Sequence, residues 1–273
     1  MICSPIVFIY LMNYYRMAAA LRYFTCSRHR KGHGIHSPFV YDFINNVLRK
    51  ETPRERQEVI LSLKKLMKQS KIRVRVNDLG GGSAYMPSAD RRLSDISRKS
   101  SVHKRHGRIL FNLAYCYDGQ NILEMGTSVG ISALYMALGA PSSRIISLEG
   151  CNNLAEIAKK NFSACKVENI DVMTGDFGEL LPIIRDINFR PSMVFVDGNH
   201  TKKAALNYFA FLKELITRDS VIIFDDINYS FEMNEAWNEI KSDSQVSVSI
   251  DIFQMGMVFF HRGMVKQDFV IRY

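Results

Sequence analysis

The chain has 273 residues, of which 47% are hydrophobic. This length and composition exclude a disordered chain and suit one α/β domain with an appendage, or two small domains. The net charge is +9, but it is uneven: residues 1–110 carry 22 Lys and Arg against 7 Asp and Glu (net +15), and residues 111–273 carry 14 against 20 (net −6). We therefore predict a basic extension or cap at residues 1–100 and a body at 101–273; the basic part could face nucleic acid, an anionic substrate or an anionic membrane, or be a solvated helical surface.

Cysteine usage and the N-terminus bear on the compartment. The cysteines are Cys3, Cys26, Cys116, Cys151 and Cys165. They form no C-x-x-C pair and their odd number lacks a secreted framework, so we expect a reduced, cytoplasmic setting. The apolar run at residues 5–12 is shorter than the roughly 20 residues of a membrane span and lacks the basic start of a signal peptide. We expect neither a span nor export, and translation could start at Met1, Met12 or Met17.

The basic part reads as helical. Ser37 followed by Pro38 predicts a helix start, and the apolar spacing after it predicts one buried helical face ending near residue 50. A second helix is predicted after Pro53. His33 and His36 lie three apart in a glycine-rich turn and could bind a metal or a phosphate, or only shape the helix entrance. Residues 78–83 (D-L-G-G-G-S) complete no βαβ unit and are predicted to form a loop over an active-site mouth.

From residue 102 onward, helix and strand patterns alternate. After a helix at 102–117, strands are predicted at 121–125, 144–148, 170–174, 192–196 and 221–224, and helices at 129–139, 153–162, 177–184, 202–217 and 231–242. Apolar strands separated by helices predict a doubly wound α/β fold, with a parallel sheet covered on both faces. Residues 246–250 and 255–261, separated by a short turn, predict an antiparallel pair that closes the sheet.

One turn carries a cofactor signal. Residues 121–132 read N-I-L-E-M-G-T-S-V-G-I-S, a strand that breaks into a turn with Gly126 and Gly130 and then a helix. Glycine allows close approach of the backbone to a ligand, and a helix start offers free N–H groups. The spacing is neither the G-x-G-x-x-G of a dehydrogenase nor a P-loop. The turn therefore predicts a nucleotide-cofactor site, with a purely structural turn as the alternative.

All five predicted strand ends carry acidic residues. They are Glu124, Glu149, Asp176, Asp197 and the pair Asp225-Asp226. Ligands of doubly wound sheets bind outside these carboxyl ends, and an acid about 20 residues after the glycine turn binds ribose hydroxyls. Asp176 and Phe177 could hold an adenine. The acids after the fourth and fifth strands could bind a hard cation such as Mg²⁺, or be solvated loop acids.

Together these motifs resemble class I S-adenosylmethionine-dependent methyltransferases, in particular the O-methyltransferase (catechol-type) branch. The resemblance rests on L-E-M-G-T-S-V-G-I-S at 123–132, L-E-G at 148–150, G-D-F at 175–177, V-F-V-D-G-N-H at 194–200 and I-I-F-D-D-I at 222–227, and it covers about residues 101–273. It implies a Rossmann-like, seven-stranded, mostly parallel sheet whose last pair is reversed. The cofactor-binding residues expected from the strand ends and the resemblance are Glu124, Gly126, Thr127, Ser128, Gly130, Ser132, Glu149, Gly150, Asp176, Phe177 and Asp197.

Metal-dependent members of that branch place an aspartate after the fourth strand and an Asp-Asn pair after the fifth. Asp197 and Asp225 have a similar spacing, but Asp226 stands where those enzymes have asparagine. The metal ligands expected are therefore Asp197, Asp225 and Asp226. His200 stands where they have a catalytic lysine, and histidine can act as a general base, so we expect His200 and Asp197 to be catalytic, although a structural His200 stays open.

Residues 31–39 (K-G-H-G-I-H-S-P-F) resemble an extension found in Bacteroidetes relatives, and a role as a lid follows from that resemblance. The sequence thus predicts an S-adenosylmethionine-dependent enzyme that methylates a hydroxyl oxygen of a small molecule, with or without Mg²⁺. The alternatives are an RNA methyltransferase that uses the basic extension and a non-catalytic cofactor-binding protein. The oligomeric state, a homodimer included, stays open.

Overall fold

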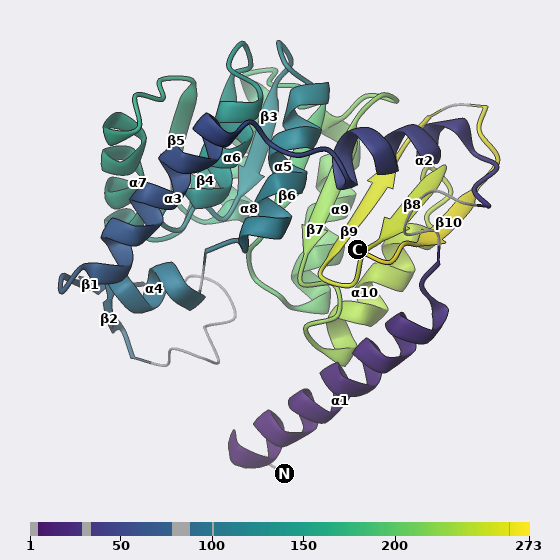
Figure 1. The fold of residues 1–273 in the computed structure, drawn as a ribbon, viewed down its shortest axis with the longest axis horizontal. Coiled ribbons are helices and arrows are strands. Elements are labelled where there is room, and N and C mark those ends of the chain that lie inside the picture. Colours follow the sequence, from purple (N-terminus) through teal and green to yellow (C-terminus); the bar gives the residue numbers. More distant parts are fainter. Residues whose placement is uncertain (1–4, 29–33, 78–87, 100, 262) are drawn as a thin grey trace.

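The computed structural model describes residues 5–28, 34–77, 88–99, 101–261 and 263–273 (Figure 1). In these ranges eight strands form one sheet in the order β10-β8-β9-β7-β6-β3-β4-β5. They are β3 (Ile122–Met125), β4 (Ile145–Glu149), β5 (Ile170–Thr174), β6 (Met193–Val196), β7 (Val221–Asp225), β8 (Val248–Asp251), β9 (Met255–Phe259) and β10 (Gln267–Val270). Strands β5, β4, β3, β6 and β7 are parallel, and β9 runs antiparallel to both β7 and β8. The predicted doubly wound sheet with a reversed C-terminal pair is confirmed.

The sheet has one strand more than the seven that the sequence predicts. Strand β10 pairs in parallel with β8, from Gln267 opposite Val248 to Val270 opposite Asp251. Its first two residues are exposed and its last two are only half-buried, so the segment has no buried apolar run. The expectation of seven strands is therefore wrong by this one strand. The strand was missed because an edge strand held chiefly by backbone hydrogen bonds produces little hydrophobic pattern in the sequence.

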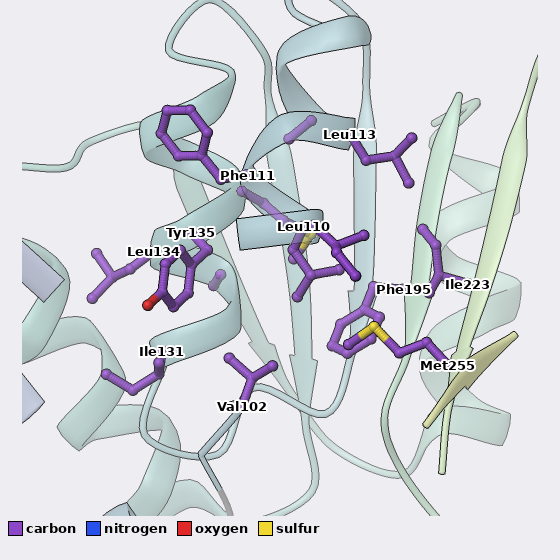
Figure 2. Close-up of a cluster of buried hydrophobic side chains, with 14 of the residues drawn as sticks. Val102, Leu110, Phe111, Leu113, Ile131, Leu134, Tyr135, Phe195, Ile223 and Met255 are labelled. Atoms are coloured by element: carbon purple, nitrogen blue, oxygen red, sulfur yellow. The ribbon is translucent and has the colours of Figure 1, made fainter. Parts of the chain in front are cut away.

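Helices cover both faces of the sheet (Figure 1). They are α5 (Lys104–Cys116), α6 (Ile131–Gly139), α7 (Asn152–Ala164), α8 (Phe177–Asp186), α9 (Lys202–Leu215) and α10 (Phe231–Ser242). Side chains of β6 alternate between two buried clusters: Met193 and Phe195 join the one with α5, α6 and α7, whereas Val194 and Val196 join the one with α8, α9 and α10. Figure 2 shows the first cluster, with Leu110 above Phe195 and with Leu134 beside Tyr135. Burial on both faces explains why the strands are apolar throughout.

The basic extension is largely helical. It comprises α1 (Pro5–Cys26), α2 (Pro38–Phe43), the π-helical turn η1 (Ile44–Leu48), α3 (Arg54–Gln69), β1 (Arg73–Arg75), β2 (Asp90–Arg92) and α4 (Leu93–Lys99). The predicted cap is confirmed, because Ser37 Oγ accepts a hydrogen bond from Val40 N at 3.4 Å. The rings of Phe39 and Phe43 pack edge-on against Phe259 of β9. The extension thus shares a hydrophobic cluster with the sheet, and a domain boundary at residue 100 stays a prediction.

Helix α1 is joined to the end of the chain. Tyr23 Oη donates to the Ile271 carbonyl at 2.5 Å and accepts from Tyr273 N at 2.9 Å. From this anchor α1 runs outward along the lower side of the molecule in Figure 1.

Among the helices the structure describes, none is long and apolar enough to cross a bilayer. The predicted loop at 78–83 and His33 lie outside the described residues, and the four described cysteines are free thiols.

Candidate active site

The turn after β3 brings three strand ends together. Gly126 has φ 110°, a backbone conformation that glycine adopts without strain. Its N–H donates to the Leu148 carbonyl of β4 at 2.9 Å. A Cβ at this position would lie 2.0 Å from the carbonyl oxygen of Asp197, at the end of β6. Only glycine therefore lets the turn lie between β4 and β6, which is the crevice where doubly wound sheets bind ligands.

Glu149, at the end of β4, holds this turn with its side chain. Glu149 Oε2 accepts from Ser128 N at 2.7 Å and Oε1 accepts from Cys151 N at 2.8 Å. The side chain is largely buried, and a carboxylate oxygen can accept more than one hydrogen bond. Ser128 has φ 49°, and its hydroxyl is buried without a hydrogen-bond partner in the structure. An orphaned hydroxyl beside a carboxylate, next to a glycine turn, suits a polar ligand.

Beneath the turn lies a buried polar group. Ser147 Oγ donates to Glu124 Oε2, and the hydroxyls of Thr127 and Ser147 are 2.5 Å apart. Burial raises the pKa of Glu124 to about 7, although the Ser132 and Ser147 hydroxyls oppose the shift. In this structure Glu124 and Thr127, both predicted to bind the cofactor, lie under the turn and have almost no exposed surface that a ligand could contact.

The ends of β5 and β6 provide an aromatic wall. Asp176 is exposed and caps α8, accepting from Gly178 N at 2.7 Å. The ring of Phe177 lies close to Gly198, where an added Cβ would stand 2.7 Å from it. It also packs edge-on against Tyr208, with ring centroids 5.9 Å apart. The structure thus brings Asp176 and Phe177 to the same edge as the glycine turn, and their role in holding an adenine stays a prediction.

After β6 and β7, three aspartates and one histidine interact electrostatically. His200 Nε2 lies 3.6 Å from Asp197 Oδ1 and 3.9 Å from Asp226 Oδ2. Burial, together with the charges of Asp226 and the nearby glutamates, raises the pKa of Asp197 to about 8. Burial and the neighbouring aspartates likewise raise the pKa of Asp225 well above its usual value. Repulsion between crowded carboxylates favours protonation, so this cluster can hold and exchange protons near neutral pH.

The predicted cation ligands do not converge as arranged. Across the described part of the chain, no group of three or more His, Cys, Asp or Glu side chains is placed to hold a metal ion. Asp225 Oδ1 is buried without a partner, which would suit a cation. Asp226 Oδ1, however, accepts a hydrogen bond from Gln254 Nε2. The donor set therefore does not form a cation cage, and Asp197, Asp225 and Asp226 as metal ligands stay a prediction.

Sequence reasoning missed several residues beside His200. The ring of Tyr229 lies 5.7 Å from that of His200, and the guanidinium of Arg16 stands 5.5 Å from the Tyr229 ring centroid. Tyr15 packs edge-on against Phe231, with centroids 6.1 Å apart. Helix α1 thus forms one wall of the site. No local pattern could connect residues more than 200 positions apart, whereas Tyr229 follows the aspartate pair in the same turn.

A hollow of about 530 Å³ opens between the first turns of α9 and α10, and Thr201, the residue after His200, is part of its lining. Its lining residues are Thr201, Lys202, Lys203, Leu206, Asn207, Glu232 and Glu235. Lys202 Nζ pairs with Glu235 at 3.5 Å and with Glu239 at 2.5 Å across the two helices. The volume falls within the range of small-molecule sites.

Comparison with known proteins agrees with this geometry. Residues 123–227 match a family described as "Methyltransferase domain". The predicted resemblance to S-adenosylmethionine-dependent O-methyltransferases is confirmed. The chain is 30% identical over 129 residues to the catechol O-methyltransferase of Mycobacterium tuberculosis (46% of this chain, 57% of that protein). It is 31% identical over 130 residues to the catechol O-methyltransferase of Niastella koreensis (46% and 58%), which fits the resemblance to Bacteroidetes proteins.

The matched segments span a little under three-fifths of the length of these two relatives. Among solved structures, an O-methyltransferase from Bacillus cereus in complex with SAH shares the fold, with a TM-score of 0.55 and 20% identity over 81% of this chain and 97% of that one. The matched family segment, residues 123–227, runs from β3 to the loop after β7. It includes the glycine turn, Glu149, His200 and all three aspartates of the cluster.

Proposed function

We propose that this chain is an S-adenosylmethionine-dependent methyltransferase that transfers a methyl group to a hydroxyl oxygen of a small molecule. The observation that carries the proposal is the tie between Ser128 and Glu149, which holds a glycine turn against the end of β6 inside the segment matched to methyltransferase domains. That edge is where doubly wound sheets hold nucleotide cofactors.

In this proposal the cofactor lies along the carboxyl edge. The turn from Gly126 to Gly130 would face its methionine part, and Ser128 would contribute its orphaned hydroxyl. Glu149 would accept from the ribose hydroxyls, because a carboxylate oxygen can accept more than one hydrogen bond. Phe177 and Asp176 would hold the adenine by stacking and hydrogen bonding. The bound cofactor would supply an electrophilic methyl group.

The chain's own residues would then act on the acceptor. His200 is 30% exposed, and the acceptor hydroxyl would lie beside its ring, at the end of the hollow that is lined by Thr201, the next residue along the chain. His200 would take the hydroxyl proton, and the carboxyl groups of Asp197 and Asp226 would stabilise the imidazolium that forms. The rigid sheet edge would hold oxygen and methyl group in line, since alignment supplies most of what a displacement needs.

The proposed mechanism uses no cation, because the carboxylates do not converge around one. The RNA alternative, the non-catalytic alternative, a homodimer and the cytoplasmic setting stay predictions, since no contact in the described residues favours them over the proposal.

The test uses S-adenosylmethionine with a tritiated methyl group, incubated with fractionated small molecules, RNA and protein. We expect label in the small-molecule fraction, in a product that keeps its label in alkali, as a methyl ether does and a methyl ester does not. Calorimetry with S-adenosylhomocysteine should show binding. Label in RNA alone would move the proposal to the RNA class, and binding without transfer to any fraction would leave a non-catalytic cofactor-binding protein.

A further inference from the structure

Helix α1 presents an apolar stripe that nothing in the described chain covers. Tyr14, Met17, Leu21 and Phe24 are 75%, 73%, 68% and 56% exposed. Their spacing of three, four and three residues places them within about 80° of one another around the helix. The opposite face is the one that packs, since Tyr23 is buried and Tyr15 contacts Phe231. Four large exposed side chains in one row are more than scattered surface residues.

The charge around this stripe has one sign. The first 41 residues contain five Lys and Arg and no Asp or Glu. Arg22, within α1, and Arg28, two residues after its last residue, are exposed. Arg272, also exposed, donates from Nη2 to the Phe24 carbonyl at 2.5 Å and stands 5.6 Å from the Phe24 ring. The apolar row is therefore bordered by guanidinium groups.

We propose that α1 binds the surface of an anionic phospholipid bilayer, with the stripe Tyr14, Met17, Leu21 and Phe24 among the acyl chains and the arginines at the headgroups. Helices with an apolar face, flanking basic residues and aromatic side chains lie in the membrane interface in this way. A basic border complements anionic lipid, and each arginine near the surface adds to the attraction.

Two other occupants fit the charges less well. A second copy of α1 would bring equally basic borders together without an acidic residue to pair with them. A nucleic acid would match the arginines but leave four large apolar side chains facing phosphates. The bilayer satisfies both parts of the surface. Because the inner face of α1 forms a wall of the candidate active site, a bound membrane would lie beside that site.

The experiment is co-sedimentation of the full chain with vesicles of phosphatidylcholine containing one third phosphatidylglycerol, or of phosphatidylcholine alone. We expect binding to the anionic vesicles, released by salt, and little binding to the neutral ones. The double variant Met17→Glu/Leu21→Glu should lose binding by at least about tenfold, because it places two negative charges on the exposed stripe that would enter the bilayer. The matched control Ile187→Glu/Val265→Glu alters two apolar residues, 50% and 80% exposed, away from α1 and should bind like the unaltered chain.

Circular dichroism and the unfolding midpoint would establish that both variants fold. Binding that is absent in the unaltered chain, or equal in the α1 variant, would overturn the proposal. Light scattering after gel filtration, without vesicles, measures the oligomeric state of the unaltered chain and of the variants. A dimer that the α1 variant alone converts to a monomer would assign the stripe to a second copy and also overturn it.

Discussion

Ser128 N donates to Glu149 Oε2 at 2.7 Å, and this hydrogen bond joins the turn after β3 to the end of β4. Cys151 N donates to the other carboxylate oxygen at 2.8 Å, so a single side chain organises two loops at the candidate cofactor site. The relationship explains why an acidic residue lies largely buried at this strand end. It also makes the site sensitive to the replacement of one carboxylate oxygen of Glu149 by an NH₂ group, because both oxygens accept a backbone hydrogen bond.

Glu149→Gln should weaken cofactor binding. The amide can still accept at one oxygen, but its NH₂ group would face a backbone N–H and leave it unpaired, at a cost of about 1–3 kcal/mol. We expect the affinity for S-adenosylhomocysteine to fall by about tenfold to a hundredfold in calorimetry. Glu156→Gln is the control, because Glu156 is exposed and pairs with Lys159 at 2.9 Å on α7. Equal affinities of both variants would contradict the role given to Glu149.

Gly126→Ala should destabilise the fold more than Gly119→Ala. Both glycines have positive φ, 110° and 81°, so both variants carry the backbone penalty of about 1–2 kcal/mol. Only at Gly126 would the new Cβ meet a backbone atom, the Asp197 carbonyl oxygen at 2.0 Å; at Gly119 nothing lies within 4 Å. Urea unfolding should therefore show an additional loss of at least about 2 kcal/mol for Gly126→Ala. Equal losses would mean that the turn moves away from β6 freely.

His200→Asn should remove methyl transfer while sparing cofactor binding. Loss of a general base lowers turnover by about a hundredfold to ten-thousandfold, and His200 does not form the glycine turn. His261→Asn is a matched control, because His261 Nδ1 also stands near an aspartate, 3.8 Å from Asp219 Oδ1, at the end of β9. Turnover with an identified acceptor and calorimetry with S-adenosylhomocysteine separate the two steps. Full turnover in His200→Asn would exclude it as the base.

Glu124 should make stability fall as the pH rises. Its folded-state pKa is raised to about 7, whereas an unfolded glutamate titrates near about 4.3. Between these values the folded state holds a proton that the unfolded state has lost, so stability declines from about pH 4 and levels off above about pH 7. Glu124→Gln cannot ionise, and we expect its unfolding midpoint to fall less over this range. If the unfolding midpoints of the two proteins fall in parallel as the pH rises, Glu124 is not the cause of the decline in stability.

Removal of divalent cations should leave methyl transfer intact. His200 can take the proton without a metal, and the three aspartates do not converge on one. Turnover in excess chelator should remain within about twofold of the untreated rate, far from the hundredfold or greater loss expected if the base itself were removed. Loss of turnover that Mg²⁺ restores would show that Asp197, Asp225 and Asp226 rearrange around a cation, as the resemblance to catechol-type enzymes implies.

Much of the fold could be predicted because its signals are local. Buried strands such as β6 are apolar on both faces, and helices such as α10 match their predicted bounds residue for residue. Strand β10 escaped prediction because an edge strand with exposed Gln267 and Asp268 buries too little to leave a pattern. The grouping of the acidic residues at one edge of the sheet was predictable, because the carboxyl ends of parallel strands lie at the same edge.

The sequence alone determined the order of strands and helices from α5 to β9, the glycine turn and the acids at the ends of the parallel strands, because periodicity and turn chemistry act over a few residues. Only the tertiary structure decided which of these side chains meet. It buried Glu124 beneath the turn, placed His200 between Asp197 and Asp226, and brought Arg16 over Tyr229. Such contacts join residues far apart along the chain, and packing of the whole molecule sets them.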